Sequence, residues 1–180
     1  MSDKELSGMT REELADHLHK ILPAEHAGKK DLLPLYTDPD WMREVVSYLA
    51  EPFEGNADLV LAPEPFGMIL GSQLAYELGV GFLPIRRRKG EPADPDKSLI
   101  ASYIDHRNEP TVLSASSAYL TEGKRVLLAD DWIETGVTLH ACRNMLEDAG
   151  VIVSGIAVIG ADYNRVSRDL IDLGVVHHIL

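Results

Sequence analysis

The sequence predicts an α/β fold: a doubly wound, mostly parallel sheet with N-terminal helices, in one domain over residues 1–180. Two observations predict it. Apolar runs of strand length occur at residues 58–62, 81–85, 125–129 and 151–159, and they are nearly continuous, as in strands of a buried parallel sheet. Between them lie segments whose apolar residues recur at helical spacing, and this alternation is typical of a parallel sheet with crossover helices.

The composition is that of a soluble globular protein, with 45% hydrophobic and 26% charged residues. Lys and Arg number 17 and Asp and Glu number 29, which gives a net charge of −12 and argues against a general nucleic-acid or anionic-membrane surface. The single cysteine, Cys142, cannot form an intrachain disulfide. No signal peptide is recognisable and no apolar run approaches the ~18 residues of a membrane span, so we expect a cytoplasmic protein.

Two helices are predicted before the first strand. Thr10 and Glu13 form a capping-box pattern ahead of apolar residues on one helical face, and this helix should stop at Pro23. Asp38 followed by Pro39 predicts the start of a second helix. Its buried side should carry Trp41, Met42, Val45, Val46 and Leu49.

A run of four cations follows the strand predicted at residues 81–85. These residues are Arg86, Arg87, Arg88 and Lys89. Such a run is unremarkable as a solvated segment. At the carboxyl end of a strand beside a phosphate site, it is better interpreted as a clamp for diphosphate, because Arg offers paired donors and Lys a point charge.

Residues 90–117 form the longest predicted connection and contain Pro92, Pro95 and Pro110. Residues 99–103 show only weak alternation of apolar and polar side chains. Connections of this length are usually functional or disordered, so we predict a mobile lid here.

The most informative stretch, residues 125–139, predicts a strand, a loop and the start of a helix. The first N–H groups of a helix lack intrahelical partners and bind anions, phosphate above all. Gly136 lets the backbone approach a ligand, and the hydroxyls of Thr135 and Thr138 add donors. Asp130 and Asp131 would accept hydrogen bonds from vicinal hydroxyls or face a hydrated Mg²⁺. The stretch therefore predicts a binding loop for a phosphorylated sugar.

Val-Leu-Leu-Ala-Asp-Asp-Trp-Ile-Glu-Thr-Gly-Val-Thr, at residues 126–138, resembles the phosphoribosyl pyrophosphate (PRPP) signature of type I phosphoribosyltransferases. Within that family the closest resemblance is to adenine phosphoribosyltransferases, and it covers residues 31–160. It implies transfer of ribose 5-phosphate from PRPP to a nitrogen of adenine with Mg²⁺, release of diphosphate, a dimer and a flexible loop over the site. The competing interpretation of the segment is an ordinary strand–helix junction with an acidic loop.

The resemblance assigns roles to named residues. It implies that the 5-phosphate is bound by Thr135, Gly136, Val137 and Thr138. Asp130 and Asp131 would bind the ribose hydroxyls and, through water, Mg²⁺. The predicted diphosphate-binding residues are Phe66, Gly67, Arg86, Arg87, Arg88 and Lys89. Tyr103 on the lid would exclude water from the site. The predicted catalytic residues are Glu134, Asp130, Asp131 and Tyr103. Lys30 and Trp132 are the candidates for contact with the base, although Trp132 is also a candidate for packing.

Four departures from the family pattern affect the diphosphate, the base and the lid. Pro65-Phe66-Gly67 replaces Ser-Arg-Gly, so one guanidinium is missing and the Glu64–Pro65 bond is expected to be cis. Lys29-Lys30 replaces an aromatic-Arg pair, and the lid after Tyr103 lacks the family's carboxylate.

The fourth departure is Glu134, which opens the phosphate loop in place of Ala. It resembles the Asp with which hypoxanthine-guanine phosphoribosyltransferases share a proton of the base. Alternatively, it points to solvent or pairs with a basic residue.

The sequence therefore predicts a PRPP-dependent phosphoribosyltransferase acting on a nitrogen of a purine-like base, adenine or a related one, and a homodimer. Two alternatives remain at this point. In one, the same fold serves a different heterocycle in a specialised pathway. In the other, the chain is a PRPP-binding or nucleotide-binding regulator without catalysis.

Overall fold

A computed structural model describes residues 8–24, 29–89, 94–104, 109–162, 165–172 and 174–180. Its helices are α1 (Arg11–Ile21), α2 (Leu33–Tyr36), α3 (Pro39–Ala50), α4 (Gly67–Glu77), α5 (Val137–Asp148) and α6 (Arg165–Asp172). Its strands are β1 (Leu59–Pro63), β2 (Gly81–Arg88), β3 (Ser98–Ile104), β4 (Pro110–Ser116), β5 (Arg125–Ile133), β6 (Ile152–Ala161) and β7 (Val176–His178). Short 3₁₀ turns are η1 (Glu51–Phe53), η2 (Pro95–Lys97) and η3 (Ser117–Tyr119).

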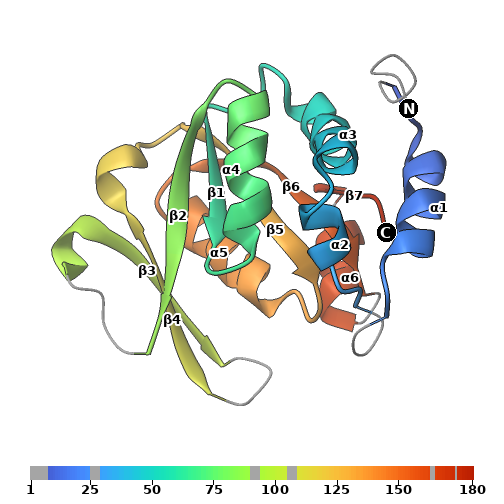
Figure 1. Ribbon diagram of the computed structural model, residues 1–180. Coiled ribbons are helices and arrows are strands. Elements are labelled where there is room, and N and C mark those ends of the chain that lie inside the picture. Colours follow the sequence, from blue (N-terminus) through green and yellow to red (C-terminus); the bar gives the residue numbers. More distant parts are fainter. Residues whose placement is uncertain (1–7, 25–28, 90–93, 105–108, 163–164, 173) are drawn as a thin grey trace.

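The strands form one sheet of seven in the order β3-β4-β2-β1-β5-β6-β7 (Figure 1). Strands β2, β1, β5, β6 and β7 are parallel, while β4 and β3 are antiparallel additions at one edge. From β1 the chain turns outward to β2, and from β5 it turns the other way to β6 and β7. The doubly wound fold is thus confirmed, and ligands in such sheets bind where the strand order reverses, between β1 and β5 here.

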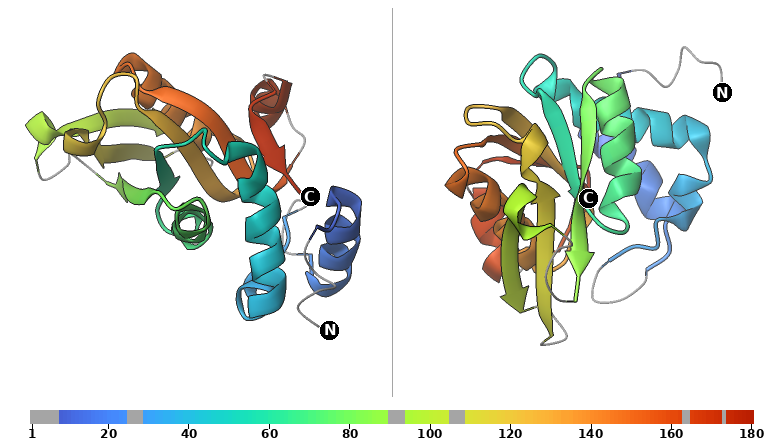
Figure 2. Two further views of the ribbon diagram at one scale, coloured as in Figure 1. Left: turned by 90° about the horizontal axis from the view of Figure 1, so that it is seen from above. Right: turned by 90° about the vertical axis from the view of Figure 1, so that its left-hand side faces the viewer.

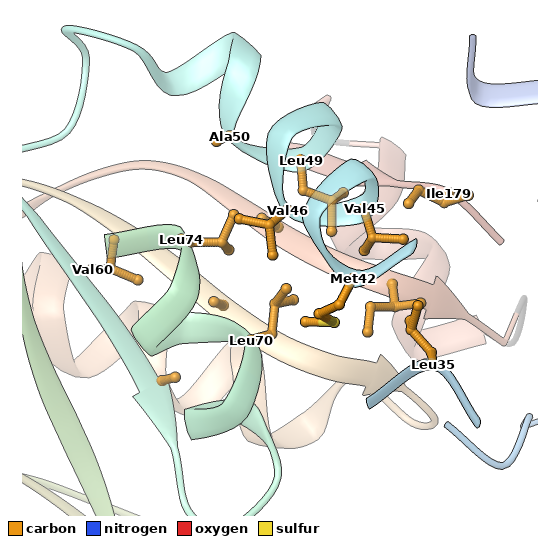
Figure 3. Packing of buried hydrophobic residues seen from close by; sticks show 14 of the residues in the cluster. Leu35, Met42, Val45, Val46, Leu49, Ala50, Val60, Leu70, Leu74 and Ile179 are labelled. Carbon is orange, nitrogen blue, oxygen red and sulfur yellow. The ribbon is translucent and has the colours of Figure 1, made fainter. Parts of the chain in front are cut away.

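Helices cover both faces of the sheet (Figure 2). On one side, α3 and α4 pack against the sheet with a cluster that includes Met42, Leu49, Leu70 and Leu74 (Figure 3). On the other side, α5 packs over a second cluster that includes Leu139 and Leu146. Two full cores of this kind hold the central strands rigid, and the loops at their carboxyl ends carry the site.

The predicted N-terminal helices are confirmed. The Thr10 hydroxyl accepts the Glu13 N–H at 3.3 Å, and the Thr10 N–H donates to Glu13 Oε2 at 2.9 Å, so α1 begins in a capping box. Asp38 Oδ1 accepts from the N–H groups of Asp40 and Trp41 at the start of α3.

The structure corrects the predicted ends of two strands. Strand β2 runs through the cationic segment to Arg88 because β4 pairs with residues 86–88, and β5 runs through both aspartates to Ile133 because β6 pairs with its end. In each case a distant strand supplies hydrogen-bond partners that the local sequence does not reveal.

The mobile lid predicted over residues 90–117 stays a prediction, but this segment contains strands that the sequence analysis did not foresee. In its described part, strands β3 and β4 form an antiparallel pair that extends the sheet, and the weak alternation at residues 99–103 belongs to β3. Residues 90–93 and 105–108 lie outside the described part of the chain.

Candidate active site

A cavity of about 320 Å³ opens at the carboxyl ends of β1 and β5, at the point where the sheet reverses. The loop from β5 to α5 forms most of its wall. Side chains from the β1–α4 loop, from β2 and from β3 complete it. The lining residues are Lys29, Pro65, Phe66, Arg87, Tyr103, Asp130, Asp131, Trp132, Ile133, Glu134, Thr135, Gly136, Val137, Thr138 and Leu139.

The phosphate loop predicted at residues 135–138 lies at the N-terminus of α5. Gly136 precedes the helix with a φ of +79°, and a Cβ there would lie 3.2 Å from the Ser167 Cα, so the position requires glycine for both reasons. The Val137 N–H donates to the Thr135 hydroxyl over a long 3.4 Å. Within the described residues, the N–H groups of Gly136 and Thr138 have no protein acceptor. The start of the helix therefore offers amide donors to an anion in the cavity.

Tyr103 joins the β3–β4 hairpin to this loop. Its hydroxyl lies 3.0 Å from Thr138 Oγ1, and both side chains line the cavity. The hairpin therefore reaches the site that the sequence assigned to a lid, and Tyr103 covers the start of α5.

Asp130 and Asp131 lie at the end of β5, side by side with the start of α4. Asp130 Oδ1 accepts the Asp131 N–H at 2.9 Å. A Cβ on Gly67 would stand only 2.8 Å from the same oxygen, so glycine lets the first turn of α4 approach this carboxylate. Burial, and then the neighbouring charge of Asp131, raises the pKa of Asp130.

Lys29 is a site residue that the sequence analysis missed. Its Nζ lies 3.5 Å from Asp131 Oδ2 and 3.4 Å from Glu134 Oε1, so one ammonium bridges two carboxylates in the cavity wall. Burial acts to lower the pKa of Lys29, but the charges of Asp131 and Glu134 outweigh it and raise the pKa above its usual value. Glu134 thus pairs with a basic residue, which is one of its two predicted roles, while it also lines the cavity.

Lys30, the predicted base contact, lies outside this cavity. Its backbone forms an antiparallel bridge with Ala24, and its side chain borders a second cavity of about 200 Å³ next to the first. The departure from the family pattern at residues 29 and 30 was the available signal, but only the fold shows which lysine enters the main cavity. Lys29, Phe66 and Asp131 line both cavities.

The four cations do not all line the cavity. Arg86, Arg87 and Arg88 lie on β2, where successive side chains point to opposite faces, and among the four only Arg87 lines the cavity. The Arg86 guanidinium pairs with Glu64 Oε1 at 2.6 Å, and Lys89 Nζ pairs with Glu109 Oε2 at 2.7 Å. Arg88 is exposed.

Trp132 serves packing. Its side chain is 7% exposed and covers Gly160 on β6, and its indole N–H donates to Asp162 Oδ1 at 3.0 Å. The predicted cis peptide bond between Glu64 and Pro65 is confirmed. It lies just before Phe66, whose exposed ring borders both cavities.

Comparisons with known proteins agree with this geometry. Residues 40–174 match the family model described as phosphoribosyl transferase domain. The chain is 37% identical over 131 residues to an adenine phosphoribosyltransferase of Leuconostoc citreum, with 72% of each chain covered. It is 34% identical over 151 residues to one from a Thermoanaerobacter species, covering 82% of this chain and 85% of that protein.

The structure of adenine phosphoribosyltransferase from Thermoanaerobacter pseudethanolicus matches with a TM-score of 0.78 at 28% sequence identity. The match covers 92% of this chain and 98% of that one. A further match is the adenine phosphoribosyltransferase from Rhodothermus marinus, with a TM-score of 0.76 at 27% identity, covering 94% of this chain and 98% of the other.

Proposed function

The chain belongs to the phosphoribosyltransferase family, and on this premise we propose that it transfers the ribose 5-phosphate of PRPP to a ring nitrogen of adenine or a related purine. In this reaction the bond from C1′ of the ribose to the purine nitrogen forms and the bond from C1′ to diphosphate breaks. The nitrogen loses its proton, and diphosphate leaves. Relatives at 34–37% identity are named as adenine phosphoribosyltransferases, which supports adenine as an acceptor.

One observation carries the proposal: the unbonded amides at the start of α5 and the paired carboxylates of β5 line a single cavity. Residues 135–138 hold the 5-phosphate, and Asp130 and Asp131 accept from the ribose hydroxyls. Arg87 and the start of α4 at Gly67 serve the diphosphate. In this assignment Arg86, Arg88 and Lys89 no longer contribute, since their side chains do not line the cavity.

Phosphoribosyl transfer through an oxocarbenium-like transition state asks the protein mainly for positioning and for stabilisation of charge. Tyr103 closes the cavity from the hairpin side and excludes water from C1′. Glu134, beside Lys29, is a carboxylate within the cavity wall that can take or share the proton of the acceptor base.

The residues present fit a Mg²⁺ ion that arrives with PRPP. Among the described residues, no group of three or more His, Cys, Asp and Glu side chains could hold a metal ion by itself. Mg²⁺ is commonly bound through one or two carboxylates together with substrate phosphates and water, and Asp130 and Asp131 supply such carboxylates. When bound, the ion neutralises charge on the leaving diphosphate.

The test is diphosphate release from PRPP and Mg²⁺ with a panel of purines, pyrimidines and small heterocycles. We expect release with at least one purine, and loss of about tenfold or more in kcat/KM when Asp131→Asn removes a carboxylate from the ribose site. Lys20→Met, on the exposed face of α1, is the control and should be unchanged. PRPP binding by calorimetry with no release on any base would contradict an enzyme and support a PRPP-binding regulator.

We further propose that the protein acts in the cytoplasm as a homodimer. In the described part of the chain, no helix has the length and apolar character needed to cross a membrane. Equilibrium sedimentation measures the assembly directly, and a monomer at micromolar concentration would contradict the dimer.

A further inference from the structure

We propose that the acceptor end of the site takes a 6-oxopurine, such as hypoxanthine, as a second acceptor beside adenine, and that Lys29 donates to its oxo group. This inference rests on the proposed function. It concerns the smaller cavity of about 200 Å³ and its border with the larger one, where the sequence departs most from its family.

The smaller cavity, which we call the slot, offers apolar surface to a flat ring. Leu33 and Phe66 border it, with exposed fractions of 64% and 55%. An aromatic ring and an aliphatic side chain that stay exposed beside a polar site offer apolar surface for the faces of a heterocycle. Phe66 also lines the cavity assigned to PRPP, so a ring against it would lie next to C1′.

The polar residues that line this slot are Lys29, Lys30, Asp31 and Asp131, and Lys29 and Asp131 also line the larger cavity. An ammonium has three N–H donors and no acceptor. Two of them can serve Asp131 and Glu134, which lie 3.5 and 3.4 Å away, and the third remains for a ligand. An oxo group of the base can accept a hydrogen bond from this third N–H. An exocyclic amino group cannot, because its own N–H groups would face the N–H groups of the ammonium.

Glu134 lines the larger cavity and not the smaller one, and it meets Lys29 where the two cavities adjoin. Its carboxylate accepts only, and it lies within 3.4 Å of the Lys29 ammonium. A 6-oxopurine presents O6 as an acceptor, and adenine presents the N6 amino group as a donor beside the N7 acceptor. A neighbouring donor and acceptor can therefore serve the 6-oxopurine through Lys29 and the adenine amino group through Glu134. A site built for one partner alone would instead leave a buried polar group unpaired and reject the other base strongly.

Tyr36 strengthens this interpretation. It lines the same slot, and its hydroxyl oxygen is buried without a hydrogen-bond partner in the described part of the chain. An unpaired buried hydroxyl is unfavourable, and a phenol can either donate or accept. A base in the slot gives it a partner whether the substituent is oxo or amino, so Tyr36 supports both acceptors.

The experiment compares hypoxanthine and adenine as acceptors in diphosphate release with PRPP and Mg²⁺. For the unaltered chain, we expect kcat/KM for hypoxanthine within about tenfold of that for adenine. Lys29→Met should lower the hypoxanthine value about tenfold more than it lowers the adenine value, because a hydrogen bond to a charged donor is lost only with the oxo base. Lys29→Arg keeps the cation and should retain hypoxanthine use, and Lys20→Met is the surface control.

Tyr36→Phe adds a readout that a purely structural role would not move. We expect KM to rise several-fold for both bases, while Tm stays equal or increases because an unpaired buried hydroxyl is removed.

The outcomes separate this inference from the proposed function. Release with adenine but none with hypoxanthine overturns the inference and leaves the function intact. An equal loss for both bases in Lys29→Met, with weaker PRPP binding by calorimetry, also overturns it, because Lys29 would then act through Asp131 on the ribose. Release with neither base overturns both. Release with hypoxanthine alone overturns the inference that the site takes both bases, because adenine would then not be an acceptor.

Discussion

Gly67 matters at the scale of a single residue because it sets how closely α4 approaches the Asp130 carboxylate. An added Cβ would lie 2.8 Å from Asp130 Oδ1 and 3.3 Å from the backbone oxygen of Ala129. Backbone at that distance cannot move aside without shifting the strand. The start of α4 can therefore lie this close to Asp130 and to the backbone of β5 only while residue 67 is glycine.

Gly67→Ala should separate the start of α4 from Asp130. We expect kcat/KM for PRPP to fall tenfold or more, and overpacking to lower the free energy of unfolding by about 1–3 kcal/mol. Steady-state kinetics and denaturant unfolding measure the two effects. Ser72→Ala, at an exposed position of the same helix, is the matched control. An unchanged KM for PRPP would show that this contact does not matter to the site.

Glu134→Gln tests the two roles that the sequence left open. A glutamine keeps the size and can still accept from Lys29, but it cannot take a proton from the base. We expect kcat to fall about tenfold or more, in the range of general acid–base effects, while PRPP binding is retained. Unchanged turnover at every pH would assign Glu134 only to the ion pair with Lys29.

At the scale of elements, β7 links the end of the chain to two helices from its beginning. The Arg11 Nε of α1 donates to the His178 carbonyl oxygen at 3.2 Å. The His177 ring stacks on Tyr48 of α3, with centroids 4.7 Å apart, and its Nε2 lies 3.2 Å from the Tyr48 carbonyl oxygen. Burial is the main cause of a lowered pKa for His177.

This lowered pKa predicts a loss of stability in acid. The pKa of His177 in the folded chain is below its value near 6.5 in the unfolded chain, so between these two pKa values the unfolded chain binds more protons. The contribution of neutral His177 to the free energy of unfolding is therefore fully present above about pH 6.5 and is lost as the pH falls toward the folded-state pKa. His177→Gln should therefore reduce the fall in Tm between pH 7.5 and pH 5. His19→Gln, exposed on α1, should leave that fall unchanged. An equal pH dependence in both variants would contradict the assignment.

At the scale of the whole molecule, a chain of net charge −12 must bind a polyanion. Groups that favour an anion lie together at one place in the fold. The start of α5, Arg87 and Lys29 line the cavity where the strand order reverses. Hydrogen-bond donors at the site therefore offset the repulsion between the net negative charge of the chain and the negative charge of PRPP.

PRPP with Mg²⁺ should stabilise the folded chain by mass action. At one hundred times its Kd, a ligand that binds only the folded state adds about 2.7 kcal/mol. For a chain of this size we expect Tm to rise by about 5–10 °C. Excess EDTA should reduce the increase by more than half, because the carboxylates and the diphosphate then repel each other. Thermal scans with and without chelator measure it, and an identical increase in both would contradict a role for Mg²⁺.

Much of the site was predictable because its parts are local in sequence. The motif at residues 126–138 contains the strand, the paired acids and the helix start in order, so Asp130, Asp131 and residues 135–138 were placed in one site correctly. Helix caps at Thr10 and Asp38 were equally local. The analysis of residues 86–88 did not foresee their pairing with β4, and that of residues 90–117 did not foresee the β3–β4 pair, because neither pairing is evident from the local pattern. Lys30, whose backbone bridges Ala24, lies outside the main cavity.

The sequence alone determined the alternation of strands and helices and which residues of the predicted phosphate loop adjoin the paired acids, because caps, turns and apolar runs act over a few neighbouring residues. Only the tertiary structure decided that Arg87 alone among four cations reaches the cavity and that Lys29, not Lys30, bridges Asp131 and Glu134. The physical reason is that β4 holds residues 86–88 in an extended strand, where side chains alternate between faces, and that the segment before α2 is placed by its contacts with the folded sheet and site.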